Sequence, residues 1–346
     1  MASPTRENRK KRGGGAAGFL LITFLLIVGV AVGFGWLVLT PFGPSTEILV
    51  DVAPGTPAMR IGRLLESEGI VRSRFAFDAV RSWKRGTLRA GEYRFDHPLT
   101  VMEVYSQIES GDVYTKTVTV PEGATIFDIA SRLEQAGFGP QQDFLAEARR
   151  QTALVADLDP TAKSLEGYLF PDTYHFSPKA TPDQIAIAMV KRFRQASAQA
   201  GLTGNLHKVV TIASLVERET AVDAERPLVA SVFENRLAKN MPLMTDPSVI
   251  YGLELQRQWR GTIYASDLKR DTPYNTYLHA GLPPGPVANP GLPSLRAAMK
   301  PAQSNYLYFV AAGQNPQGKS MFATSLEEHD RNVAGYRHAL KKAGGR

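Results

Sequence analysis

Residues 16–39, AAGFLLITFLLIVGVAVGFGWLVL, decide the architecture of this chain of 346 residues. The stretch has no charged side chain and exceeds the roughly 20 apolar residues that a helix needs to cross a bilayer core. A cleaved signal peptide, the rival interpretation, has a shorter apolar region of about 7–15 residues and a small-x-small cleavage site. Here Thr40-Pro41-Phe42-Gly43-Pro44 follows instead. We therefore predict a transmembrane helix over residues 16–40.

Five basic residues precede this helix: Arg6, Arg9, Lys10, Lys11 and Arg12. Basic residues flanking a span stay in the cytoplasm, so residues 1–15 are predicted to be a cytoplasmic tail. We expect a single-pass protein of the cell inner membrane, with everything after about residue 45 in the periplasm or at the cell exterior. Much of the net charge of +7 belongs to this tail, so it does not indicate a nucleic-acid partner.

Residue types exclude several kinds of site. The chain has no cysteine, which excludes disulfides, thiolate metal sites and a cysteine nucleophile. The six histidines are scattered without a His-x-x-x-His spacing, so a zinc site is not predicted. Gly-x-Ser-x-Gly is absent, and no Ser-x-x-Lys stands at a suitable helix start. We expect no metal and no other cofactor.

An internal repeat follows the membrane segment at a constant offset. Val50, Val52, Gly55, Ile61, Leu65, Glu66 and Gly69 recur as Val118, Val120, Gly123, Ile129, Leu133, Glu134 and Gly137. Each copy predicts a strand of alternating apolar residues, a turn, and an amphipathic helix closed by a glycine. After the first copy we predict a helix at 75–83, a strand at 91–95 and a helix at 101–109.

These elements predict a small α+β module over residues 46–116, joined to the membrane helix by a short spacer at 40–46. The module resembles the LysM-like subdomain that precedes the catalytic part of one family of cell-wall enzymes. That resemblance implies either a spacer without a ligand or a glycan-binding domain.

Residues 117–346 form the second predicted domain, so the fold class is α+β with a mixed helical and loop-rich larger domain. Helices are expected at 181–199, 205–222 and 228–239, followed by a Tyr/Pro/Gly/Asn-rich region to about residue 293. Residues 306–310 predict a buried strand, and 325–342 a last helix.

Carboxylates are the remaining candidates for chemistry, and two lie in the helical segment Thr211-Ile212-Ala213-Ser214-Leu215-Val216-Glu217-Arg218-Glu219-Thr220. Glu219 follows Leu215 and Val216 by four and three positions, which places it on the apolar stripe, while Glu217 lies about 200° away. Burial raises a carboxyl pKa toward the range of a general acid, and a helix C-terminus acts in the same direction. The alternative is a structural ion pair between Glu219 and Arg226 or Arg236.

A family resemblance bears on this choice. The block Ala213-Ser214-Leu215-Val216-Glu217-Arg218-Glu219-Thr220-Ala221 resembles the signature of the endolytic murein transglycosylases of the YceG-like family. Five further blocks match in order: Glu166-Gly167-Tyr168-Leu169-Phe170-Pro171-Asp172-Thr173-Tyr174, Thr245-Asp246-Pro247-Ser248-Val249-Ile250-Tyr251-Gly252, Tyr274-Asn275-Thr276-Tyr277, Gly281-Leu282-Pro283-Pro284-Gly285-Pro286 and Tyr306-Leu307-Tyr308-Phe309-Val310. In that family the second Glu of the signature is catalytic, which implies Glu219.

The resemblance implies a lyase that cleaves the β-1,4 bond between N-acetylmuramic acid and N-acetylglucosamine in peptidoglycan and forms a 1,6-anhydro end. Glu219 would act as acid and then as base. A muramidase hydrolase would need a second carboxylate, for which Asp246 and Glu166 are candidates. A non-catalytic, membrane-tethered peptidoglycan-binding protein is the third possibility.

Substrate contacts are predicted for Asp246, Asn275 and Tyr277, because aromatic faces suit sugar rings and amides suit acetamido groups. Their alternative role is structural: Asp246 would cap a turn before Pro247, and the Tyr/Asn pair would brace the loop. The family is linked to terminating nascent glycan strands, which implies peptidoglycan strands as substrate and membrane-bound penicillin-binding proteins as partners.

Overall fold

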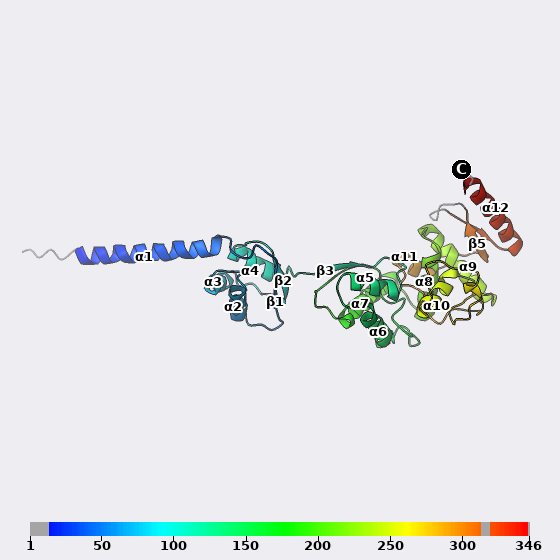
Figure 1. Cartoon of the computed structure of the whole chain (residues 1–346), viewed down its shortest axis with the longest axis horizontal. Coiled ribbons are helices and arrows are strands. Elements are labelled where there is room, and N and C mark those ends of the chain that lie inside the picture. Colours follow the sequence, from blue (N-terminus) through cyan, green and yellow to red (C-terminus); the bar gives the residue numbers. More distant parts are fainter. Residues whose placement is uncertain (1–13, 313–318, 345–346) are drawn as a thin grey trace, which may run out of the picture. The chain divides into compact units, whose positions relative to one another are not determined.

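The computed structural model describes residues 14–312 and 319–344 (Figure 1), so the basic cluster of residues 6–12 lies outside the described residues. The chain divides into two compact units, Met1–Thr115 and Lys116–Arg346. Both units mix helices with short antiparallel strand pairs, which confirms the α+β class.

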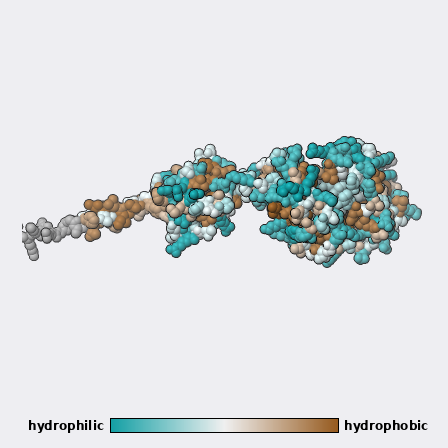
Figure 2. All heavy atoms as spheres, turned by 90° about the horizontal axis from the view of Figure 1, so that it is seen from below, coloured by the Kyte–Doolittle hydropathy of each residue, from teal (hydrophilic) through white to brown (hydrophobic). Residues whose placement is uncertain are grey.

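The first helix, α1 (Gly14–Leu39), is apolar along its whole length and exposes its side chains (Figure 2). Its segment Gly18–Leu39 has a mean hydropathy of 2.5 and is long enough to cross a membrane, which is compatible with a single-pass anchor. The last turn of α1 joins the core of the first unit through Val38, whose exposed fraction is 8%.

The rest of the first unit is a two-stranded sheet with three helices. Strands β1 (Ile48–Val52) and β2 (Gly91–Phe95) pair antiparallel, with Val50 opposite Tyr93. The helices are α2 (Ala58–Ser67), α3 (Arg74–Lys84) and α4 (Val101–Ser110). Apolar side chains from every element form one core, at whose centre the Tyr93 hydroxyl donates to the carbonyl of Arg89 at 2.7 Å. The strand and helices predicted at 75–109 are confirmed.

The predicted repeat is present in the backbone. Strand β3 (Lys116–Thr119) and helix α5 (Ile126–Gln135) open the second unit as β1 and α2 open the first. The turn glycines Gly55 and Gly123 have φ of +78° and +76°. The second copy continues through α6 (Gln141–Arg150) to β4 (Thr173–Phe176), which pairs with β3. After α1, the first unit therefore has the same β-α-α-β order with which the second unit begins.

The second unit then becomes helical around α8 (Leu206–Glu219). Its longer helices are α7 (Pro182–Ala200), α9 (Arg226–Ala238), α10 (Asp246–Leu255) and α11 (Leu292–Met299), and its short helical turns are η1 (Thr152–Val155), η2 (Asp223–Glu225) and η3 (Asp267–Lys269). Helices α9, α10 and α11 all pack against α8. Residues 211–216 of α8 are buried on every side, so this helix is the centre of the unit.

Two sequence expectations need correction. The helix expected to reach residue 222 ends at Glu219, because Thr220 adopts an extended conformation with φ −140° and ψ 134°. The strand expected to be buried at 306–310 is β5 (Tyr308–Ala311), and it is partly exposed. It pairs with β6 (Ser320–Ala323) in a two-stranded ribbon, against which α12 (Leu326–Gly344) packs.

Gly167 provides a stability test of the second unit. Its φ is +87°, and a Cβ there would lie 2.5 Å from Pro286 Cγ and 2.8 Å from Val210 Cγ1. Gly167→Ala adds a clash to the backbone strain, so we expect it to reduce the free energy of unfolding by about 2–4 kcal/mol. Chemical denaturation of the full chain in detergent measures this loss.

Gly261→Ala is the matched control, because Gly261 has a φ of +82° and open space around the added Cβ. It should cost only the backbone strain, about 1–2 kcal/mol. Equal losses for the two variants would show that the tight packing of Gly167 against Pro286 contributes nothing.

Candidate active site

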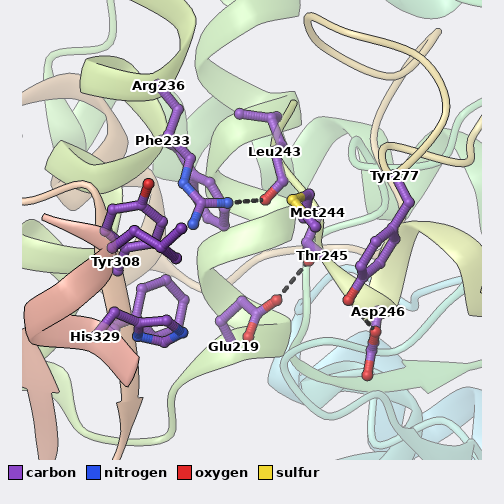
Figure 3. A pocket seen from close by; sticks show the side chains of 12 residues that line it. Glu219, Phe233, Arg236, Leu243, Met244, Thr245, Asp246, Tyr277, Tyr308 and His329 are labelled. Atoms are coloured by element: carbon purple, nitrogen blue, oxygen red, sulfur yellow. Dashed lines mark hydrogen bonds between the residues drawn. The ribbon is translucent and has the colours of Figure 1, made fainter. Parts of the chain in front are cut away.

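A cavity of about 380 Å³ opens in the second unit where α8 ends. Residues from α8, α9, the segment before α10, strand β5 and helix α12 line it, together with Tyr277 (Figure 3). Its size is in the range of ligand sites, and Glu219 lies in its wall between Thr245 and the Tyr308–His329 pair.

Glu219 is the last residue of α8 and is half-buried. Its Oε1 accepts a hydrogen bond of 2.5 Å from the Thr245 hydroxyl. Burial raises the pKa of Glu219 from 4.5 to about 7, and the charge of Asp246 adds to the rise, while the Thr245 hydrogen bond and the Arg236 charge oppose it. The carboxyl is therefore divided between its acid and base forms near neutral pH.

Across the described ranges, no ion pair involves Glu219, so the structural alternative proposed for it is not found. Arg236, which lines the cavity together with Glu219, is held by carbonyls: its Nε donates to Leu307 O at 2.6 Å and its Nη1 to Leu243 O at 2.7 Å. Its guanidinium also lies over the Tyr308 ring, 5.2 Å from the centroid. The cation thus influences Glu219 without neutralising it.

Glu217 has the opposite environment two residues earlier. Its Oε1 accepts from Arg226 Nη1 at 2.9 Å, and its Oε2 accepts from the backbone N–H of Gly291 at 2.9 Å. The Glu217 and Arg226 side chains are 6% and 5% exposed, and Arg226 also pairs with Asp223. Glu217 is therefore a structural carboxylate that ties α8 to α9 and to the segment before α11.

Asp246 and Tyr277 lie in the same cavity as Glu219. Thr245 is the N-cap residue of α10 and Asp246 is its first helical residue. The Tyr277 hydroxyl donates to Asp246 Oδ1 at 2.7 Å, and burial raises the pKa of Tyr277. Their placement brings a carboxylate and an aromatic ring to the wall on the side of Thr245 (Figure 3).

Asn275 does not line the cavity. It is fully buried, and its side-chain amide donates to the carbonyls of Leu268 and Arg270 at 3.0 and 2.8 Å. Its Oδ1 accepts from the backbone N–H of Tyr277 at 2.9 Å. The loop-bracing role describes Asn275 here, and through this brace the residue fixes the backbone of Tyr277.

Glu166, the other candidate second carboxylate, is outside the cavity as well. Its Oε2 accepts from the Ile126 N–H at 2.9 Å and its Oε1 from Asn289 Nδ2 at 2.8 Å. Burial raises the pKa of Glu166 to about 8. It joins the second copy of the repeat to the helical part of the unit, and it is not placed to share a substrate with Glu219.

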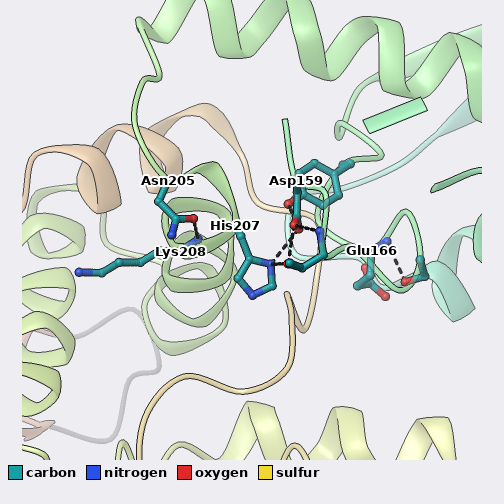
Figure 4. A network of polar contacts seen from close by, with 8 residues as sticks. Asp159, Glu166, Asn205, His207 and Lys208 are labelled. Atoms are coloured by element: carbon teal, nitrogen blue, oxygen red, sulfur yellow. Dashed lines mark hydrogen bonds and ion pairs between the residues drawn. The ribbon is translucent and has the colours of Figure 1, made fainter. Parts of the chain in front are cut away.

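A polar network fixes the opposite end of α8 (Figure 4). Asp159, 1% exposed, accepts from the Tyr168 hydroxyl at 2.7 Å and lies 2.8 Å from His207 Nδ1 in the first turn of α8. Thr161 donates to its other oxygen from both backbone and hydroxyl. With Asp159 at its start and Glu217 near its end, α8 is held at both ends.

The sequence did not identify Thr245, Tyr308 or His329 as cavity residues. Thr245 carried a signal, because it begins the block that contains Asp246. His329 comes from α12 and stacks on Tyr308 with ring centroids 5.1 Å apart, and burial lowers its pKa. No local motif marks His329, since only the packing of α12 on β5 brings it here.

Replacing each of the two glutamates of α8 by glutamine should have opposite effects on stability. Glu219 has a folded pKa above its ordinary value, so its contribution to stability is present below pH 4.5 and is lost as the pH rises to about 7. Glu219→Gln removes this loss, and the variant should gain Tm relative to the parent at pH 8 but not at pH 4.5. Thermal unfolding of the full chain in detergent measures both values.

Glu217→Gln is the paired variant, two positions away and with the same change of atoms. This change removes the charged partner of the buried Arg226. Breaking such a pair costs about 3–5 kcal/mol, so the Tm should fall at both pH values. If Glu219→Gln also destabilised the chain at pH 8, the raised pKa of Glu219 would be wrong.

Comparisons with known proteins point to one family. The sequence profile of the YceG-like family matches residues 50–335. The chain is 32% identical to the endolytic murein transglycosylase of Bacillus subtilis over 88% of its length and 90% of the relative's. It is 31% identical to that of Streptococcus pneumoniae, over 91% of its own length and 64% of the relative's.

A solved structure shows the same fold. A crystal structure of a protein from Listeria monocytogenes that is described as YceG-like superposes with a TM-score of 0.54 at 30% identity, over 83% of this chain and 99% of that one. With the family profile spanning both units and relatives above 30% identity, the chain belongs to the YceG-like family.

Proposed function

We propose that this chain is an endolytic peptidoglycan lytic transglycosylase, a lyase that cleaves the β-1,4 bond between N-acetylmuramic acid and N-acetylglucosamine. The relatives are named endolytic murein transglycosylases, and the observation that carries the proposal is Glu219, a half-buried carboxyl without an ion pair whose pKa is raised to about 7. The expected product carries a 1,6-anhydro end, which terminates elongation of the glycan strand.

In the first step, protonated Glu219 donates its proton to the glycosidic oxygen. The bond from that oxygen to C1 of the muramic acid breaks, and the N-acetylglucosamine residue leaves with a free 4-hydroxyl. Burial supports this step because it keeps a fraction of Glu219 protonated at neutral pH. Positive charge develops at C1 and its ring oxygen.

In the second step, the Glu219 carboxylate takes the proton of the muramic 6-hydroxyl, and that oxygen bonds to C1. The anhydro ring closes and Glu219 regains its proton, so a single carboxyl serves both steps and no water is consumed. The Thr245 hydroxyl and the Arg236 charge favour the ionised form between the two steps.

Asp246 and Tyr277 are proposed to act on the sugar. The Asp246 carboxylate, held by the Tyr277 hydroxyl at 2.7 Å, supplies negative charge near the cationic sugar ring, and the Tyr277 ring offers an aromatic face. The alternative muramidase reaction would use Asp246 to activate water, and the mass of the product separates the two reactions.

The membrane topology forms part of the proposal. Helix α1 would span the cell inner membrane once, with the basic tail in the cytoplasm and both folded units in the periplasm. In the periplasm the cavity would have access to newly made glycan strands, and membrane-bound penicillin-binding proteins are the partners that we propose. The first unit would act as a LysM-like module between membrane and catalytic unit.

Muropeptide mass spectrometry tests the reaction. We expect the full chain in detergent to release fragments from purified sacculi that end in 1,6-anhydromuramic acid, one water lighter than reducing ends. Glu219→Gln should reduce this release by at least about 1,000-fold, because it removes both the acid and the base.

Glu234→Gln is the control, an isosteric change at a carboxylate that pairs with Lys208 outside the cavity. It should retain the parent's activity. Reducing ends from the parent would point to the muramidase, and equal release by Glu219→Gln would remove Glu219 from the reaction.

The pH dependence of kcat/KM gives a separate test. The acid form of Glu219 disappears as the pH rises through its pKa, so activity should fall above about pH 7. Thr245→Val removes a hydrogen bond that lowers this pKa and should move the fall to higher pH. Asp246→Asn removes a charge that raises it and should move the fall to lower pH.

Opposite shifts from two neighbouring variants cannot come from a general loss of packing. Steady-state rates on a soluble glycan strand from pH 5 to 9 give the midpoint for each protein. A midpoint that stays in place in both variants would show that another group controls the rate.

A further inference from the structure

Two large apolar side chains stand exposed on one side of α3 in the first unit. Phe75 and Trp83 are 68% and 71% exposed. With Ala79 they occupy positions i, i+4 and i+8, so they form a single row along the helix. The buried side chains of the same helix, Phe77 and Val80, point into the core and account for its folding. The exposed row has no part in that core.

The start of α3 lies against the outer end of the membrane helix. The Arg72 guanidinium is 4.2 Å from the centroid of the Trp36 ring and 5.0 Å from that of Phe42, and its Nη2 donates to Pro41 O at 3.5 Å. Helix α3 itself packs against α1 (Figure 1). Trp36 belongs to the last turn of the apolar span, the depth at which tryptophan marks the boundary between lipid and water.

Basic side chains accompany the row. The Arg74 guanidinium lies 4.7 Å from the Phe75 ring and the Lys84 ammonium 5.2 Å from the Trp83 ring, and the exposed Arg85 follows as the C-cap. The one acidic residue of α3, Asp78, is half-buried and lies 3.8 Å from Arg81. Aromatic rings next to basic side chains are typical of a helix that lies in the headgroup layer of an anionic leaflet.

We infer that the row Phe75–Ala79–Trp83 of α3 is a membrane-docking surface, with Phe75 and Trp83 among the lipid headgroups and Arg74, Lys84 and Arg85 on anionic phospholipid. The inference rests on the membrane anchoring through α1 that is proposed above. Docking gives the first unit a second attachment to the bilayer beside α1. Together with the packing of α3 against α1, this second attachment fixes the orientation of the unit on the leaflet.

Tryptophan quenching in nanodiscs tests this inference, because the chain has three tryptophans, Trp36, Trp83 and Trp259. The full chain is reconstituted in nanodiscs of phosphatidylcholine and phosphatidylglycerol with bromine at shallow acyl positions. W36F/W259F retains Trp83 alone, and W83F/W259F retains Trp36 alone. The control places one tryptophan at Tyr114, in the segment that leads to the second unit, with the three native ones changed to Phe.

We expect bromolipid to quench Trp83 to at least half the extent of Trp36, and to leave the control unchanged. R74Q/K84Q should reduce the quenching of Trp83 at least twofold, with that of Trp36 unaffected. None of the substituted side chains is fully buried, so folding should be preserved, and the thermal unfolding of each variant verifies this.

Quenching of Trp36 without quenching of Trp83 would overturn the docking surface while leaving the anchor in place, and another protein would then be the remaining occupant of the row. If bromolipid quenched neither Trp36 nor Trp83, anchoring and docking would both be overturned. Muropeptide release by Glu219 is measured separately, so the loss of the docking inference and the loss of the proposed reaction give different results. Quenching of Trp83 that is unchanged in R74Q/K84Q would contradict the role given to anionic headgroups.

Discussion

The partial burial of Glu219, with no counter-ion among the described residues, is the constraint on which the rest of the site depends. Burial is the largest influence on its pKa, and the Thr245 hydroxyl donates a hydrogen bond to the carboxyl. A buried carboxylate without an ion pair is unfavourable for folding. The protein tolerates it because the group takes up a proton instead, and the same proton is what glycosidic cleavage requires.

The contacts of the two neighbouring arginines explain why Glu219 has no ion pair among the described residues. Arg226 is occupied by Glu217 and Asp223, and Arg236 by backbone carbonyls, so neither arginine neutralises Glu219. Each of these contacts also holds an element in place: Arg226 joins α8 to η2, and Arg236 joins α9 to the segment before α10. Structural polar pairs are thus what keep the Glu219 carboxyl free of an ion pair among the described residues.

Much of the fold followed from local patterns that the sequence displays. The apolar run of α1 and the repeated glycines at 55 and 123 each act over one turn or one helix. The choice of Glu219 as the candidate followed from helical spacing, because the apolar stripe of α8 is a property of the helix itself, and the structure places this residue in the cavity. The end of α8 at Glu219 was less predictable, since no glycine or proline directly follows it.

Other features depend on contacts between distant segments. The side-chain amide of Asn275 is a group that suits sugar binding. Only the folded loop around it shows that this amide already donates to the carbonyls of Leu268 and Arg270. His329 enters the cavity because α12 returns to β5, which no spacing in the sequence specifies. Partial exposure of β5 likewise reflects how little covers a two-stranded ribbon.

The central claim is that the Glu219 carboxyl exchanges its proton near neutral pH, and a direct titration tests it. Carbon-13 NMR of the full chain with glutamate labelled at the side-chain carboxyl, with Glu219→Gln used to assign the signal, gives the pKa of this one group. The account predicts a midpoint near 7, well above the ordinary 4.5. A midpoint at 4.5 would contradict it, because the residue would then be a solvated carboxylate and not a general acid.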